Sequence, residues 1–491
     1  MFNLSVSNLL LGIFFCLPQG ELFGESENTE TQEVVRKANI ILMMCDDLGW
    51  GDVGFNGNQI IQTPHLDAMS RNGMKWNRFY AASAVCSPTR GSVVTGRHPY
   101  RYGIPTANAG HMKPEEHTLA ELLGKLDYRT GHFGKWHLGT LTTSIKDSNR
   151  GGTRSSAHFS PPWKNGFEVC FSTEAKVPTY DPMLKPVAKA SNKGWDYLKN
   201  LSAAVPYGTY YWNHQGKHRH YFRFHLYLYL MFPFIEQAIA EGSPFFAIVW
   251  FHAPHLPVVA GPRHSAQYAQ YDSYPKNYFG CITAMDEQVG RLRATLKRLN
   301  VSENTLLAFC SDNGPEGNSK APGSSGVFRG RKRDLYEGGI RVPSLMEWPA
   351  VIPAGSQTDF PAVTSDYLPT ILDILNIKPL DSRPMDGMSL LPVIKGELLS
   401  RPKPIGFEFG GKLALSDNRF KLVYYPEKKR GKKDSVKQEI DLPAYQLYDL
   451  LADPFEKKDL ASLYPETVWS MARQLSDWRV SCRQSDDGAD Y

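Results

Sequence analysis

Three runs of hydrophobic residues lie far apart in the chain, and each ends in polar side chains. They span residues 39–47 (NIILMMCDD), 244–257 (PFFAIVWFHAPHLP) and 304–316 (NTLLAFCSDNGPE). A short apolar run bounded by turn residues is typical of a strand that is buried on both faces. We therefore expect three buried strands, although one such ending alone would mean only that a turn follows the strand.

Amphipathic stretches lie between these runs. Residues 117–126 (HTLAELLGKL) and 283–299 (TAMDEQVGRLRATLKRL) have the spacing of helices with one apolar face. Strands that alternate with helices predict an α/β fold, with a large mixed, mostly parallel sheet sandwiched by helices. Ligands bind beyond the carboxyl ends of the strands in such sheets, so the three polar endings suggest one convergent site.

The pattern changes after about residue 395. Residues 410–427 and 444–461 read as short antiparallel strands, and residues 465–482 read as a closing helix. We expect a smaller C-terminal α+β domain over residues 396–491. Its basic run 428–433 (KKRGKK) is interpreted as a solvated hairpin tip, with contact to an anionic polymer as the alternative.

The amino-terminal apolar run, Leu9 to Leu17, is too short to span a bilayer. Small and polar residues follow it, which predicts a signal peptide over residues 1–24 and export to the periplasm or the exterior. The usual positive start is missing, and a buried N-terminal helix is the alternative. No later segment predicts stable membrane insertion, so the main domain is expected over residues 25–395.

Composition narrows the class of protein. The chain has 491 residues, of which 42% are hydrophobic, and a net charge of only +5, which gives no reason to expect a nucleic-acid partner. Seven cysteines occur without a C-x-x-C pair, so neither a zinc site nor a dense disulfide framework is expected. One or two disulfides remain open.

One cysteine has unusual neighbours, in the stretch AVCSPTRGSVVTGRHPYRYG at residues 84–103. Ser87 as an N-cap and Pro88 at the first helical position predict a helix start, which puts Cys86 where free N–H groups favour anions. Arg90 would lie one turn further and could clamp an oxyanion. The alternative is a buried free cysteine that caps a helix.

This stretch resembles the C-x-P-x-R-x(4)-T-G signature of the sulfatases, a family within the alkaline phosphatase superfamily. Further segments resemble sulfatase segments in the same order: DDLGWGDVG (46–54), GKWHLG (134–139), APHLP (253–257), SDNGPE (311–316) and GRKRDLYEGGIRVP (330–343). They cover the chain from about 38 to 395, and residues 448–461 resemble the C-terminal domain of the family. The resemblance implies a sulfuric ester hydrolase.

The resemblance also implies one divalent cation. Its ligands would be Asp46, Asp47, Asp312 and Asn313, with residue 86 completing the shell. Oxygen donors without histidine suit Ca²⁺ or Mg²⁺ better than zinc, and several carboxylates favour Ca²⁺ with its looser coordination.

In the family, a separate formylglycine-generating enzyme converts the signature cysteine, here Cys86, to Cα-formylglycine (3-oxoalanine). The resemblance implies that its hydrate attacks the sulfur of the ester, helped by the cation, Arg90 and Lys135.

Further roles carry over from the same motifs. His255, with Lys332 beside it, matches the acid that protonates the leaving alcohol, and His137 matches the base that takes a proton from the second hydroxyl. Lys135 and Lys332 would also neutralise sulfate oxygens. Lys135 and His137 alternate, so an extended chain would project both from one side. His252 is expected behind His255 or in the substrate pocket.

Two other functions are weighed against sulfatase activity. The same scaffold serves phosphoester and phosphonate-ester hydrolysis, but a two-metal phosphatase would need more His and Asp ligands. A non-catalytic binder of sulfated glycans would follow if Cys86 were never converted.

The natural substrate stays open between sulfated carbohydrate and simple aryl sulfate. Residues 140–230 are irregular and read mainly as long loops. Within them, residues 214–232 depart from the family pattern, because they are basic and aromatic. This segment is interpreted either as an ill-defined loop or helix, or as a surface for sulfated sugars.

Overall fold

The computed structural model describes residues 37–148, 150–188, 195–197, 204–219, 226–379, 381–426 and 445–491. The predicted signal peptide and the basic run at 428–433 lie outside these ranges. Within them, no helix combines the length and the apolar character needed to cross a membrane. The six cysteines of this part of the chain are all free and buried, so no disulfide joins them.

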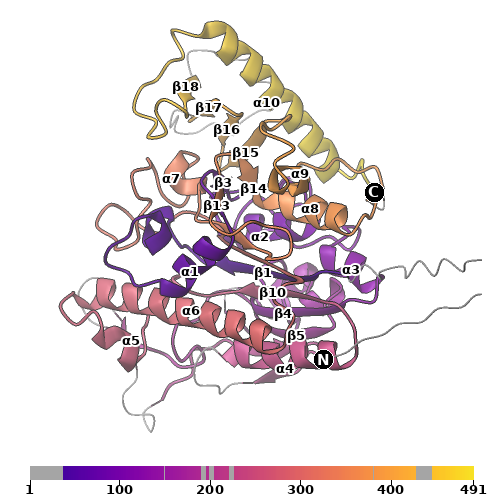
Figure 1. The fold of residues 1–491 in the computed structure, drawn as a ribbon, viewed down its shortest axis with the longest axis vertical. Coiled ribbons are helices and arrows are strands. Elements are labelled where there is room, and N and C mark those ends of the chain that lie inside the picture. The colour runs from indigo at the N-terminus through magenta and orange to yellow at the C-terminus, as the bar shows by residue number, and fades with distance from the viewer. Residues whose placement is uncertain are drawn as a thin grey trace, which may run out of the picture. The chain divides into compact units, whose positions relative to one another are not determined.

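A ten-stranded sheet forms the centre of the described structure (Figure 1). Its middle is a run of five parallel strands: β11 (Thr305–Ser311), β1 (Asn39–Cys45), β10 (Phe245–Trp250), β4 (Arg129–Lys135) and β5 (Val169–Thr173). Outside β11 lie β12 (Leu345–Glu347), β2 (Met74–Trp76) and β13 (Ser356–Thr358), and outside β5 lie β8 (Tyr211–Asn213) and β9 (His218–Arg219). The expected mostly parallel α/β sheet is confirmed.

The three apolar runs become the adjacent strands β11, β1 and β10, as their composition predicts. Every residue of β1 is buried, and Ile41 lies between Leu307 and Ala247 in the register. The sequence analysis did not predict β4 and β5 as strands. β4 contains Arg129, two glycines and a histidine, and β5 lies inside the region read as loops. The sheet buries both because their neighbours supply the pairing, not because their own residues are strongly apolar.

Side chains of β1 alternate between two cores, one on each face of the sheet. Ile41 and Met43 face a layer made by α1 (Pro64–Asn72), α4 (Leu226–Ala240) and α6 (Ser273–Arg298). Ile40 and Leu42 face a layer made by α2 (Cys86–Thr95), α3 (Leu119–Gly124) and α8 (Tyr367–Ile374) (Figure 1). The helices predicted around 117–126 and 283–299 are α3 and α6.

Shorter elements complete the main layers. Helix α5 (Pro262–Ala266) comes after β10, α7 (Glu337–Ile340) after β11 and α9 (Leu391–Ile394) after α8. Two-stranded pairs join β3 (Phe79–Tyr80) to β14 (Ala362–Val363) and β6 (Val187–Ala188) to β7 (Trp195–Asp196). Within the unusual segment 214–232, β9 and the start of α4 are described, and residues 220–225 are not.

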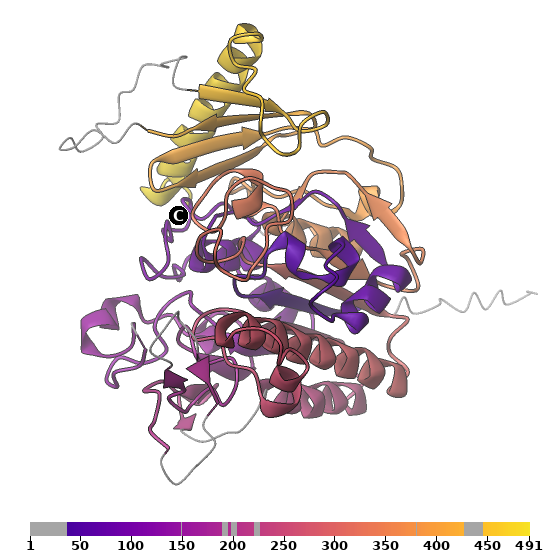
Figure 2. The same ribbon diagram turned by 90° about the vertical axis from the view of Figure 1, so that its left-hand side faces the viewer.

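A four-stranded antiparallel sheet follows in the C-terminal part, as predicted (Figure 2). It consists of β15 (Ile405–Phe409), β16 (Lys412–Ser416), β17 (Phe420–Tyr424) and β18 (Tyr445–Asp449). One face packs on α10 (Pro465–Asp486) through Leu422 and Leu475, and the other packs on Tyr80 and Leu335 of the main part. The contacts group residues 37–491 as one compact unit, and the domain boundary near 395 stays a prediction.

Gly134 in β4 gives a test of how tightly the parallel strands fit. Its φ is +112°, and a Cβ added there would lie 2.0 Å from the carbonyl oxygen of Trp250 on β10. We expect Gly134→Ala to lower the free energy of unfolding by about 3 kcal/mol or more, because backbone must shift to relieve the clash. Thermal unfolding followed by circular dichroism measures the loss.

Gly124→Ala is the matched control, since no atom lies within 4 Å of its added Cβ at the end of α3. It should change stability by no more than about 1 kcal/mol. Equal melting temperatures for the two variants would contradict the clash.

Candidate active site

Polar residues converge at the carboxyl ends of four parallel strands. Asp46 directly follows β1, Asp312 directly follows β11, His255 lies in the loop after β10, and Lys135 ends β4. Asp47 has a φ of +68°, so the chain turns sharply after β1, and its N–H donates to Asp312 Oδ1 at 3.1 Å. Strand order therefore brings the predicted residues from distant parts of the chain to one place.

Three buried carboxylates face three buried cations. The closest pairs are Asp46 with Lys135 (2.7 Å), Asp47 with Lys332 (2.6 Å) and Asp312 with Arg90 (2.5 Å). All six side chains are at most 4% exposed, so each charge depends on its partner. Removing one partner of such a buried pair costs about 3–5 kcal/mol.

The charges of this cluster give two neighbouring carboxyl groups, those of Asp46 and Asp312, different pKa values. Burial alone would raise the pKa of Asp46, but Lys135, His255 and Arg90 outweigh it and hold that pKa well below its usual range. Burial, followed by the charge of Asp46, raises the pKa of Asp312 to about 7. Asp46 is therefore the carboxyl group of the pair that is more readily ionised.

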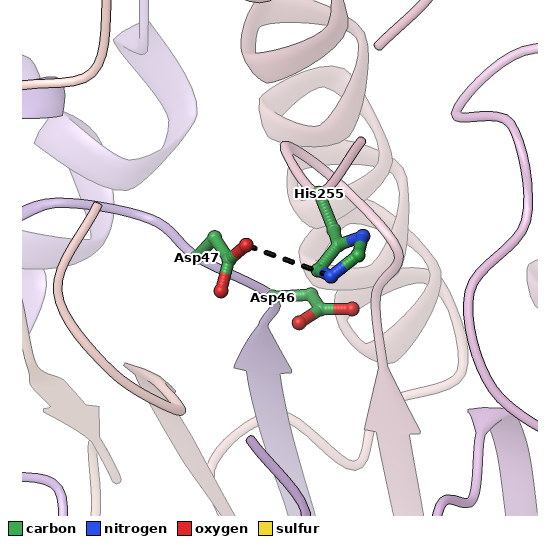
Figure 3. Close-up of side chains that lie close together, drawn as sticks. All are labelled: Asp46, Asp47 and His255. Atoms are coloured by element: carbon green, nitrogen blue, oxygen red, sulfur yellow. Dashed lines mark ion pairs between the residues drawn. The ribbon is translucent and has the colours of Figure 1, made fainter. Parts of the chain in front are cut away.

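Two oxygen atoms in the cluster indicate room for a cation. Asp46 Oδ1 and Asn313 Oδ1 are buried and accept no hydrogen bond from the described residues. Ligand atoms of Asp46, Asp47 and His255 lie within 4.8 Å of one another (Figure 3), as do those of Asp46, Cys86 and Asp312. This set is rich in oxygen ligands, and two of these oxygens accept no hydrogen bond, so it fits a hard divalent cation of the Ca²⁺ type.

Cys86 is the first residue of α2 and is buried against the cluster. Its Sγ lies 3.5 Å from His137 Nδ1, and burial raises the pKa of its thiol. The predicted N-cap role of Ser87 is wrong, because the helix already begins at Cys86 and the N-cap is Val85. Ser87 Oγ instead donates to the carbonyl oxygen of His137 at 2.7 Å, which fixes the loop that carries the histidine.

His137 reaches Cys86 by a route that strand alternation does not describe. β4 ends at Lys135, and His137 has a φ of +61°, so the expected extended arrangement of these two residues is wrong. His137 Nε2 lies 2.8 Å from Asn108 Oδ1, an acceptor, which leaves Nδ1 without a proton and facing Cys86. Burial, Lys135 and Arg150 lower the pKa of the ring, so it is neutral in the folded protein.

His255 and His252 have different surroundings. His255 Nδ1 is 2.7 Å from the Leu256 carbonyl oxygen, and its Nε2 is 3.7 Å from Asp47 Oδ2 (Figure 3). Its side chain is 17% exposed, whereas that of Asp47 is buried. His252 is buried, 2.8 Å from Thr173 Oγ1, and burial lowers its pKa to about 3. Its place behind His255 or in the substrate pocket stays a prediction.

Three further residues around the site were not predicted from the sequence. Asn108 holds the ring of His137, and Arg150 bonds to the carbonyl oxygens of His137 and Gly110. Glu316 lies 3.3 Å from Lys332 Nζ. Glu316 is part of the quoted SDNGPE segment and could have been found there, whereas Asn108 and Arg150 lie in irregular chain without a periodic pattern.

The chain matches known proteins along most of its length. The family model described as Sulfatase matches residues 38–377, and the model described as N-sulphoglucosamine sulphohydrolase, C-terminal, matches residues 323–480. N-acetylgalactosamine-6-sulfatase of Mus musculus is 34% identical over 381 residues, 74% of this chain and 68% of that protein. Steryl-sulfatase of Rattus norvegicus is 28% identical over 418 residues, covering 73% and 70%.

A solved structure agrees with these relatives. The crystal structure of Ps i-CgsB in complex with k-i-k-neocarrahexaose superposes with a TM-score of 0.74 at 27% identity, covering 91% of this chain and 94% of that one. The extent of the family match and the identity to its members leave one conclusion. This chain belongs to the sulfatase family, and the protein is a sulfuric ester hydrolase.

Proposed function

We propose that the protein hydrolyses sulfate monoesters of sulfated carbohydrates. The reaction would use one bound Ca²⁺ and a Cα-formylglycine that is formed by conversion of Cys86. The observation that carries this proposal is the position of Cys86, buried between His137 and a cluster of cations and carboxylates. A thiol with a raised pKa makes a poor nucleophile there. As an aldehyde hydrate, residue 86 would supply the oxygen nucleophile for attack on sulfur.

The cation site and the surrounding side chains have complementary tasks. Asp46, Asp47, Asp312 and Asn313 would hold Ca²⁺, which supplies a Lewis acid beside residue 86. Lys135 and Lys332 lie near Cys86, because their positive charges oppose the rise that burial causes in the pKa of its thiol. They would bind the sulfate oxygens and stabilise the charge that develops on them.

Proton transfer would fall to two histidines, His255 and His137. In its acid form His255 carries a proton on each nitrogen. Nε2–H would protonate the leaving alcohol, while Nδ1–H stays bonded to the carbonyl oxygen of Leu256. Asp47, at 3.7 Å, stabilises that charged ring. His137 Nδ1, with its Nε2–H bonded to Asn108, would accept the proton of the second hydroxyl of residue 86. The C–O bond to the sulfate would then break, so that sulfate leaves and the aldehyde re-forms.

Sulfated carbohydrate is favoured as the substrate class over simple aryl sulfates. Among the relatives are a protein named for N-acetylgalactosamine-6-sulfate and a structure bound to a neocarrahexaose. The implied partners are such a sulfated substrate and a formylglycine-generating enzyme. We also propose that the chain is exported by the signal peptide predicted at residues 1–24, whose placement the structure does not describe.

Mass spectrometry tests the identity of residue 86. Trypsin should release the peptide Phe79–Arg90, and protein made together with a formylglycine-generating enzyme should carry an aldehyde at residue 86. Cys86→Ala should retain the melting temperature within a few degrees and lose sulfate release. Fully active protein whose peptide carries only an unmodified thiol would refute the mechanism.

Metal removal tests the cation site through stability alone. A ligand that binds only the folded state at 100 times its Kd adds about 2.7 kcal/mol, so chelation with EDTA should lower the melting temperature and Ca²⁺ should restore it more effectively than Mg²⁺. Asp46→Asn is the comparison variant and should lose most of this calcium response. Identical melting curves with EDTA and with Ca²⁺ would argue against a cation bound at this place.

The role of His255 is tested with two leaving groups. His255→Ala should reduce sulfate release from a 6-sulfated amino sugar at least tenfold more than release from nitrophenyl sulfate, because nitrophenolate leaves without protonation. A panel of sulfated mono- and oligosaccharides assayed with the unaltered enzyme identifies the sugar. Equal losses on both substrates would remove His255 as the acid.

A further inference from the structure

Residues 333–336, which follow Lys332, contact the C-terminal part of the chain through hydrogen bonds and one aromatic stack. Lys412 of β16 donates to the carbonyl oxygen of Arg333 at 2.6 Å and lies 3.2 Å from Asp334 Oδ1. The backbone N–H of Leu335 donates to Tyr425 Oη at 2.8 Å. Tyr336 stacks on Tyr425 with ring centroids 4.7 Å apart.

A buried charge cluster anchors the far end of this segment. Lys421 of β17 lies 2.9 Å from a carboxylate oxygen of Glu337 and 2.9 Å from one of Glu456, and all three side chains are fully buried. The N–H of Glu337 donates to Glu456 Oε2, and Tyr80 Oη donates to Glu337 Oε2. The anchor therefore joins the C-terminal sheet to the strand β3 that precedes Cys86.

The turn that carries Lys332 needs such support. Asp334 N–H donates to Arg331 O, and Arg333 has a φ of +77°, a left-handed conformation that is unfavourable for a non-glycine residue. Such a conformation persists only where its surroundings hold it. The N–H of Arg333 donates to Ala84 O, two residues before Cys86, and its carbonyl oxygen is held by Lys412.

We propose that the C-terminal sheet is a positioning element for Lys332, and that Lys412 is its principal positioning residue. By holding Arg333 in the left-handed turn, Lys412 keeps the ammonium group of Lys332 against Asp47 and near residue 86. Lys412 itself touches no reacting atom. The inference rests on the role of Lys332 in the proposed function.

A double-mutant cycle between Lys412 and Lys332 tests the proposal in the full-length, formylglycine-bearing enzyme. Lys412→Met should lower kcat about tenfold, equivalent to about 1.4 kcal/mol. Lys412→Arg should retain most of the kcat, because its guanidinium group can also donate to the carbonyl oxygen of Arg333. In a Lys332→Met background, Lys412→Met should change kcat less than about twofold, because its effect passes through Lys332.

Lys403→Met is the control, an exposed lysine that precedes the same sheet, and it should leave kcat unchanged. Each variant is checked by its melting curve and by the converted fraction of residue 86, so that misfolding or incomplete conversion is not read as lost positioning. Tyr425→Phe, which removes the acceptor for Leu335 N–H, serves as the second variant if Lys412→Met does not fold. It should lower kcat in the same non-additive way.

Two results separate this inference from the function on which it rests. If Lys332→Met retains the unaltered kcat, the proposed role of Lys332 fails. If Lys332→Met is impaired while folded Lys412→Met or Tyr425→Phe turns over normally, or loses the same factor in both backgrounds, the positioning role is overturned and the proposed function stands.

Discussion

The site depends on the mutual neutralisation of charges that water cannot reach. Asp46, Asp47 and Asp312 are buried at the ends of two neighbouring strands, and each needs a cation within contact distance. A buried carboxylate without a partner would be protonated or would destabilise the fold by several kcal/mol. Arg90, Lys135 and Lys332 are therefore required by the fold as well as by the proposed chemistry.

This requirement explains why the elements around the sheet are arranged as they are. α2 supplies Arg90, β4 supplies Lys135, and the segment before α7 supplies Lys332. Each belongs to a different element, so the cluster holds together parts of the chain that are hundreds of residues apart. The same convergence leaves Oδ1 of Asp46 and Oδ1 of Asn313 without hydrogen bonds from the described residues, and the proposed cation would use these oxygens.

The C-terminal sheet extends this network beyond the main sheet. Its buried Lys421 is neutralised by Glu337 and Glu456, one from each side of the contact. A short sheet with one amphipathic helix buries a limited apolar area, and its second face is covered by Tyr80, Leu335 and Ile340 of the main part. In this arrangement the C-terminal part and the Lys332 segment stabilise each other.

The sequence by itself determined the family, the central strands and the candidate residues of the site. Residues 39–47 and 304–316 carry both a buried strand pattern and the polar groups at its end. The motif around Cys86 and the other segments that resemble sulfatases implied the remaining partners. These features can be recognised locally, because a run of consecutive residues shows both that a strand is buried on its two faces and that a turn follows it. The C-terminal antiparallel strands and α10 were predictable for the same reason.

The tertiary structure alone decided how those groups meet. β4 and β5 are strands because their neighbours pair with them, and His137 reaches Cys86 through a left-handed turn held by Ser87. Asn108, Arg150 and Lys412 lie in or beside turns and loops, where no periodicity marks a contact with the site. Their roles arise from hydrogen bonds across long sequence separations, which depend on the packing of the whole chain and not on any local run of residues.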